Sequence, residues 1–242
     1  MCYPNMAGPE ASPTLRVEMS DCASSANAAA SNARSPKVFF SVCYDEDGGR
    51  ADVMYSAWQA RHQTISAVYL DSRVSQPAKP LGEDEVKRTI RDAVHQTTIT
   101  CVLIGAHTSG DRWVRYEIAQ SVERRSGLLA VRINSIADPK TQQRTVAGWN
   151  PLAYLGVGKI RSGDYLLFEN INGQWSRYQD HPLALPKPPY VPDMSPGYVQ
   201  PLSVGLHEYD YVAQNGVENL DQWIEQAAAK AAIASKIASF GA

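Results

Sequence analysis

The chain lacks most features that mark secreted, membrane or nucleic-acid-binding proteins. It has only four cysteines among 242 residues, with no CxxC pair and no metal-like Cys/His spacing, which excludes a disulfide framework. No apolar run approaches the roughly 18–20 residues that span a bilayer, and no secretory signal precedes the first strand pattern. The formal net charge is −2, so there is no global attraction to nucleic acid or acidic membranes. We expect a cytoplasmic protein with no metal, nucleic-acid or membrane partner.

Standard nucleotide and hydrolase motifs are also missing. The sequence has no GxxxxGK[ST], no GxGxxG after a strand, no HExxH and no GxSxG. Gly156-Val157-Gly158-Lys159 is a fragment of a phosphate loop, and a turn is the simpler interpretation. Any function must therefore be sought in other residues.

Strand and helix patterns alternate four times between residues 37 and 134. Strands are predicted at 38–43, 67–70, 99–105 and 128–133, and helices at 51–61, from 83, and from 112 behind an Asp111 N-cap. Short links between such elements are typical of a doubly wound, parallel sheet of the flavodoxin-like α/β class. We predict one sheet domain over 37–134.

The two flanks have different compositions. Residues 1–36 are rich in Ala, Ser, Asn and Pro and bury too little apolar surface to offset their ordering entropy, so a flexible leader is expected. Residues 135–242 carry a hairpin signal at Asn172-Gly173, a Pro-rich tract and an Ala-rich helix from about Glu218. We predict a C-terminal hairpin and helix extension that packs on the sheet domain.

The segment after the first predicted strand, residues 44–50, is acidic. It could hold Mg²⁺ as phospho-receiver domains do, but a solvated loop with an N-cap at Asp47 is the simpler interpretation. A receiver also needs an acceptor aspartate after its third strand, where this chain has Gly105-Ala106-His107. This counts against a phosphoacceptor.

Trp113 and Glu117 stand four residues apart, on one face of the helix that follows the third strand. Open α/β sheets bind ligands at this carboxyl end. Glu117 lies beyond the first helical turn and has no basic residue three or four positions away. On composition alone, a core tryptophan beside a solvated acid remains the simpler interpretation.

Five segments of the chain form a recognisable set: Val38-Phe39-Phe40-Ser41, Arg50-Ala51-Asp52-Val53, Thr100–Gly105, Trp113–Ile118 and Tyr209–Val212. Together they resemble the TIR-like domains of bacterial Thoeris anti-phage defence systems. The resemblance covers roughly residues 37–225 and implies a TIR fold with NAD⁺ as substrate and Glu117 as the catalytic residue. The chain departs from this family at Val42-Cys43, where relatives carry an aromatic-histidine pair, and after Asp71, where they often carry tryptophan.

The resemblance implies an NAD⁺ glycohydrolase or ADP-ribosyl cyclase that needs no further cofactor. The nicotinamide of NAD⁺ leaves neutral, and one carboxylate could stabilise the oxocarbenium-like ribose. An ordinary glutamate pKa of about 4.3 would leave Glu117 ionised at pH 7. The ring contacts expected are Phe39, Phe40 or Trp113, and the loops at 44–50 and 71–82 would frame the dinucleotide. The other expected substrate-binding residues are Ser41, Tyr44, Asp45, Arg50 and Asp71.

The acceptor decides the product. Water gives ADP-ribose, an adenine or ribose hydroxyl of the substrate gives a cyclic isomer, and another nucleophile gives a conjugate. In Thoeris-like systems the product is a second messenger for a separate effector protein, and self-assembly is a further implication. The alternatives are a non-catalytic TIR scaffold and, less favoured, a receiver-like phosphoacceptor.

Overall fold

The structure is a computed structural model that describes residues 36–61, 67–69 and 82–240. Its centre is a five-stranded parallel sheet in the order β2-β1-β3-β4-β9. The strands are β1 (Val38–Val42), β2 (Ala67–Tyr69), β3 (Ile99–Ile104), β4 (Gly127–Arg132) and β9 (Glu208–Asp210). The prediction of a doubly wound α/β sheet is therefore confirmed.

The fifth strand comes from the segment that was expected to be an extension. In β9, Tyr209 is in register with Val131 of β4, and the two strands run parallel. The division of the chain at residue 134 stays a prediction, but the central sheet itself includes a strand from beyond that point. The predicted leader covers residues 1–36, of which only Pro36 lies within the described residues.

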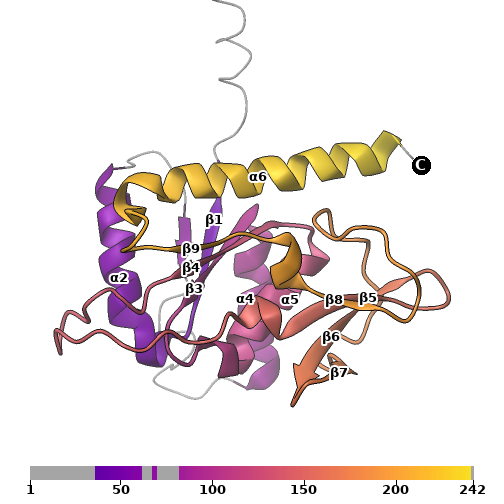
Figure 1. Cartoon of the computed structure of the whole chain (residues 1–242), viewed down its shortest axis with the longest axis horizontal. Coiled ribbons are helices and arrows are strands. Elements are labelled where there is room, and N and C mark those ends of the chain that lie inside the picture. Colours follow the sequence, from indigo (N-terminus) through magenta and orange to yellow (C-terminus); the bar gives the residue numbers. More distant parts are fainter. Residues whose placement is uncertain (1–35, 62–66, 70–81, 241–242) are drawn as a thin grey trace, which may run out of the picture. The chain divides into compact units, whose positions relative to one another are not determined.

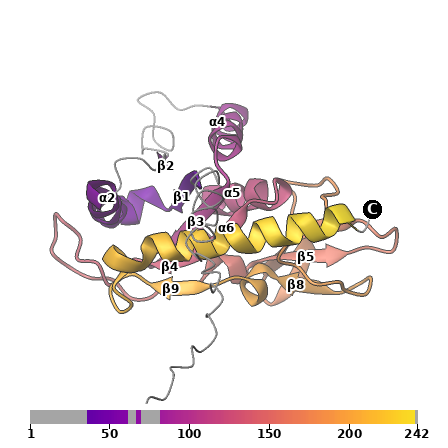
Figure 2. The ribbon, with the colours of Figure 1, turned by 90° about the horizontal axis from the view of Figure 1, so that it is seen from above.

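Helices cover both faces of this sheet. Helices α2 (Tyr44–Arg61) and α6 (Gly216–Phe240) pack on one face, in a core that includes Phe40, Trp58 and Trp223. Helices α4 (Glu83–His95) and α5 (Arg112–Glu123) pack on the other face, where Phe39 and Tyr116 meet. In both views α4 lies beside α5 and away from α6 (Figure 1; Figure 2). This alternation of β1 side chains between two cores follows from the two-residue period of a strand.

A second, antiparallel sheet packs against α5. Its order is β7-β6-β5-β8, with β5 (Leu155–Lys159), β6 (Tyr165–Ile171), β7 (Gln174–Arg177) and β8 (Val199–Pro201). The predicted hairpin is confirmed, because Asn172 and Gly173 connect β6 to β7 with φ values of 51° and 85°. Residues 156–159 belong to β5, so their interpretation as a turn was wrong.

Short 3₁₀ helices complete the described connections: η1 (Thr108–Gly110), η2 (Pro151–Ala153) and η3 (Leu202–Gly205). Within the described ranges, no helix is both long enough and apolar enough to cross a membrane.

The acidic segment 44–50 is helical, which corrects its prediction as a loop. The amides of Glu46 and Asp47 bond to the Cys43 carbonyl, so α2 begins directly after β1. Asp47 is inside the helix and only 1% exposed, and it pairs with Arg50 one turn later. The loop prediction was wrong because local propensities do not include the burial of these polar side chains by elements distant in the sequence.

Candidate active site

Glu117 lies in the middle of α5 and points toward the sheet. Asp111 caps this helix, accepting hydrogen bonds from the amides of Trp113 at 2.7 Å and Val114 at 3.1 Å, as the sequence predicted. Glu117 is 7% exposed, and its Oε2 accepts a hydrogen bond from Ser41 Oγ at 2.5 Å. The glutamate is therefore a buried, oriented group, which corrects its simpler interpretation as a solvated helix residue.

Ser41 reaches Glu117 because β1 alternates its side chains. Phe39 and Ser41 share the face that is covered by α4 and α5, whereas Phe40 points to the α2 side. Ser41 is fully buried, and a hydroxyl at this position offers a donor where its strand neighbours are apolar. One strand residue thus fixes the orientation of a helix carboxyl group 76 positions away.

Burial raises the pKa of Glu117 to about 8, and the nearby Asp111 charge acts in the same direction, whereas the Ser41 hydrogen bond opposes the rise. The expected ionisation at pH 7 therefore conflicts with the burial of this carboxyl group, which favours its protonated form. The reason is tertiary, since the fold removes water from a side chain that would titrate normally in an open helix. A cation placed beside Glu117 would favour its ionised form.

Asp111 and Cys43 extend the polar part of this site. Burial raises the pKa of the Cys43 thiol to about 12, and a hydrogen bond with the Asp111 carboxylate adds to the rise. Cys43 comes from the end of β1, Asp111 from the loop after β3, and Glu117 from α5. The carboxyl ends of two neighbouring strands therefore bring the Cys43 thiol close to Asp111, whose charge in turn contributes to the raised pKa of Glu117.

The structure separates the three predicted ring contacts. Phe39 is fully buried in the core of α4 and α5, and half-buried Trp113 packs against that core. The Trp113 ring stands edge-on to Tyr116, with 6.4 Å between centroids, and the guanidinium of Arg112 lies 5.2 Å from its centre. Phe40 instead packs against Trp58 on the opposite face of the sheet, with 5.4 Å between the ring centroids. We therefore leave Phe40 out of the proposed site.

Two other predicted substrate contacts lie at the carboxyl edge of the sheet. Tyr44 is half-buried and Asp45 is exposed in the first turn of α2, directly after β1. Asp71, together with most of the predicted 71–82 loop, lies outside the described residues.

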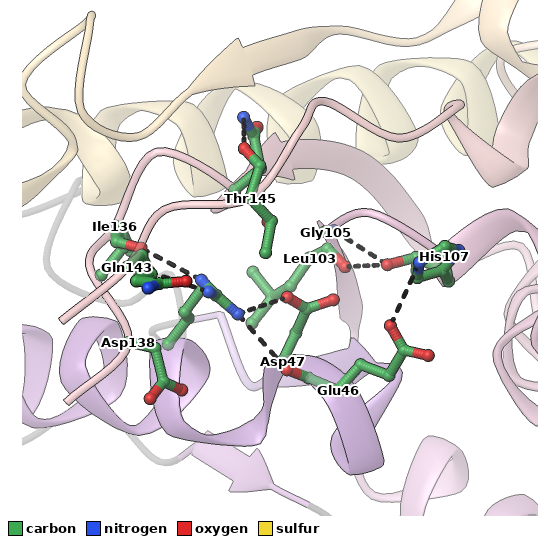
Figure 3. Close-up of polar contacts among 12 residues, drawn as sticks. Glu46, Asp47, Leu103, Gly105, His107, Ile136, Asp138, Gln143 and Thr145 are labelled. Carbon is green, nitrogen blue, oxygen red and sulfur yellow. Dashed lines mark hydrogen bonds and ion pairs between the residues drawn. The ribbon is translucent and has the colours of Figure 1, made fainter. Parts of the chain in front are cut away.

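Arg50 has a structural position. The residue is 4% exposed, and its guanidinium donates to the carbonyls of Ile136 and Gln143, both at 3.0 Å, and to Asp47 Oδ1 at 3.2 Å. Figure 3 shows these bonds joining the start of α2 to the segment after β4. Because its donors are engaged with protein acceptors, we assign Arg50 to tethering this segment and not to substrate.

Asp47 packs against the end of β3 in the same network (Figure 3). A Cβ at Gly105 would lie 1.7 Å from Asp47 Oδ2, so no larger residue fits at position 105 without moving the carboxylate. Among the described residues, Oδ2 has no hydrogen-bond partner. Burial raises the pKa of Asp47, and the Arg50 charge opposes that rise.

Comparisons with known proteins agree with this architecture. The model of the family described as Thoeris protein ThsB, TIR-like domain, matches residues 39–138. ThsB1 of Bacillus cereus (strain MSX-D12), which carries the provisional name cyclic ADP-D-ribose synthase, is 33% identical over 195 residues. The alignment covers 78% of this chain and 98% of that protein. This chain belongs to the Thoeris ThsB family.

The ThsB match includes the whole candidate site, because Ser41, Cys43, Asp111 and Glu117 all lie between residues 39 and 138. Sequence reasoning identified Asp111 only as a helix cap and gave Cys43 no part in the site. The order Asp111…Glu117 is visible in the sequence as two acids within two turns, but periodicity could not reveal that both face the end of β1.

Proposed function

We propose that this ThsB-family protein cleaves NAD⁺ at the nicotinamide–ribose bond and forms a cyclic, ADP-ribose-derived signalling nucleotide in anti-phage defence. The observation that carries the proposal is the buried Glu117 carboxyl, held by Ser41 at the ligand-binding edge of the sheet. The relative named as a cyclic ADP-D-ribose synthase supports the substrate and the product class.

The proposed first step breaks the bond between ribose C1′ and the nicotinamide nitrogen. The bonding electron pair goes to the pyridinium ring, which leaves as neutral nicotinamide without needing a proton. Positive charge develops on the ribose, and ionised Glu117 stabilises it more strongly than it stabilises the ground state. The cationic nicotinamide ring of the substrate itself favours the ionised form of Glu117.

In the second step a nucleophile of the ADP-ribose moiety forms a bond to C1′, and its proton passes to solvent. Burial of Glu117 supports cyclisation over hydrolysis, because little water reaches a side chain that is 7% exposed. We propose Trp113, Tyr44, Asp45 and Asp71 as substrate contacts and Ser41 as the residue that positions Glu117. The product would act on a separate effector protein.

A non-catalytic scaffold is the alternative function. The segment after β4 exposes two large apolar side chains, Val146 at 77% and Trp149 at 73%, which supports self-assembly or a protein partner. The receiver-like alternative has less support, because the acidic segment 44–50 is the start of α2 and Asp47 is paired with Arg50.

Mass spectrometry of the purified protein with NAD⁺ tests the proposal. We expect nicotinamide together with a product of the mass of cyclic ADP-ribose, in excess over ADP-ribose. Lysates of phage-infected cells that express the protein provide any activating factor. No nicotinamide release in either setting would reject the enzymatic function and favour the scaffold.

A further inference from the structure

The two glycines of β5, Gly156 and Gly158, leave room for aromatic rings on one face of the second sheet. The strand residues that alternate with them point into the core shared with α5, so both glycines lie on the opposite face. A Cβ at Gly158 would lie 2.6 Å from Phe168 Cε2. A Cβ at Gly156 would lie 3.0 Å from Trp175 Cζ3. The two rings therefore lie over backbone that carries no side chain.

A groove of about 510 Å³ runs along these rings. Phe168 and Trp175 are both half-buried and line the groove from β6 and β7. Tyr198 is 70% exposed and lines it from the turn before β8. The Gly197 amide ties this turn to β5 by donating to the Lys159 carbonyl at 2.9 Å. Three aromatic side chains from three segments therefore meet in one groove, which shares no residue with the candidate active site.

Two cations line the same groove. Lys159 Nζ lies 5.8 Å from the centre of the Tyr165 ring, and Arg161 is exposed in the turn between β5 and β6. In the part of the chain that the structure describes, neither cation forms an ion pair. A cation that lies over an aromatic ring keeps its charge, so both remain able to bind an anion.

The acids of the neighbouring loops do not line the groove. Asp164 accepts a hydrogen bond from the Ser162 hydroxyl at 2.7 Å. Asp193 pairs with Lys187 at 2.5 Å, and its pKa is lowered by Lys187 and, to a smaller degree, by Lys159. The described lining of the groove thus combines two positive charges and three aromatic rings with no carboxylate.

We propose that this groove binds a nucleotide, whose base stacks on the aromatic rings and whose phosphate contacts Lys159 and Arg161. Every base has a π-face that can stack on an aromatic side chain, and Lys and Arg both bind phosphate groups. The groove has the volume of a small-molecule site, for which about 300–1,000 Å³ is typical, so one nucleotide fits it better than a long strand. The proposed site is separate from Glu117 and does not depend on NAD⁺ cleavage.

Three probes separate the two parts of this recognition. AMP has both a base and a phosphate, adenosine lacks the phosphate, and ribose 5-phosphate lacks the base. Binding to the full chain is measured by titration, with the probe followed by NMR. We expect AMP to bind roughly tenfold more tightly than either of the other probes. High salt should weaken the binding of AMP but not that of adenosine, because it screens only the phosphate contact.

Two variants test where AMP binds. Trp175→Ala removes a ring and Arg161→Gln removes a charge, and each should weaken AMP binding roughly tenfold. Trp149→Ala and Arg144→Gln are matched controls, because they change an exposed tryptophan and an exposed arginine in the segment after β4. Both controls should leave AMP binding within about twofold. Thermal unfolding checks the fold, and Arg161→Gln decides the result if Trp175→Ala is unfolded, because position 161 is in an exposed turn.

The proposal is overturned if the wild type does not bind AMP, or if Arg161→Gln and the folded Trp175 variant bind it as the wild type does. An oligoadenylate that binds more tightly per nucleotide than AMP, with an affinity that rises with its length, would replace the nucleotide with single-stranded nucleic acid. Failure of NAD⁺ cleavage would reject the proposed function of the Glu117 site and leave these binding results unaffected.

Discussion

Two buried acids lie near the carboxyl edge of the same sheet, and they have opposite surroundings. Asp47 is 1% exposed and has Arg50 at 3.2 Å, whose other donors bind backbone carbonyls. Glu117 is 7% exposed, and the described residues near it supply a neutral serine hydroxyl and a second acid. Burial raises the pKa of both, but only Asp47 has an opposite charge to offset it.

The surroundings of Asp47 are those of an acid that holds the fold together, whereas the surroundings of Glu117 suit an acid that contacts a ligand. A buried charge needs a partner, and Arg50 supplies it within the protein. Glu117 has no such partner among the described residues. A bound cation would therefore supply the opposite charge that the Glu117 carboxylate lacks. Perturbed acids of this kind concentrate at functional sites.

The largest expected effect is on catalysis at Glu117. Glu117→Gln should reduce nicotinamide release about 10²–10³-fold or more, because the amide keeps the shape but cannot carry the stabilising charge. Product formation is followed by liquid chromatography of the reaction. Glu123→Gln on the same helix, whose acid is 41% exposed, is the control and should retain activity. Equal activity of Glu117→Gln and wild type would remove the catalytic role of Glu117.

The second-largest expected effect is on stability, and it concerns the ion pair between Asp47 and Arg50. Arg50→Ala leaves Asp47 buried without its cation and releases the segment after β4, so the free energy of unfolding should fall by about 3 kcal/mol. Glu117→Gln should change it by less than about 1 kcal/mol, because it replaces a mostly neutral acid with a neutral amide. Urea unfolding measures both. A larger loss in Glu117→Gln than in Arg50→Ala would reverse our assignment of the two acids.

A third expectation is the pH dependence of cleavage. Because Glu117 must lose its proton to act and its pKa in the free protein is about 8, kcat/KM should rise with pH through about 8. The cationic nicotinamide ring of the bound substrate lowers that pKa, so the corresponding rise in kcat should occur at lower pH. Initial rates across pH 5–9 test this. A kcat/KM that is already constant above pH 6 would contradict the raised pKa of Glu117.

The smallest expected effect is at Ser41. Its hydrogen bond lowers the pKa of Glu117, so Ser41→Ala should move the rise in kcat/KM to higher pH and reduce the rate at pH 7 several-fold. Ser121→Ala provides a matched control, because that buried hydroxyl bonds to Thr100 and to the Glu117 carbonyl, not to its carboxyl group. Identical pH profiles of the two variants would show that Ser41 only fills space.

Much of the fold follows from patterns within a few residues. The first strand and the Asp111 cap of α5 were predicted and are confirmed. The start of α2 was not predicted, because its polar residues become helical through burial against β3 and the segment after β4. The fifth strand was missed because it pairs with β4 across a long sequence separation.

The candidate site also has features that local sequence patterns predict and features that depend on long-range contacts. The sequence by itself determined that an aromatic and an acid share one face of a capped helix after a buried strand, and family resemblance drew attention to Glu117. Only the tertiary structure decided that Ser41 orients this acid, that Asp111 shares its surroundings, and that Phe40 lies on the other face. The physical reason is that helix phase and capping are local, whereas the proton on Glu117 depends on water excluded by elements distant in sequence.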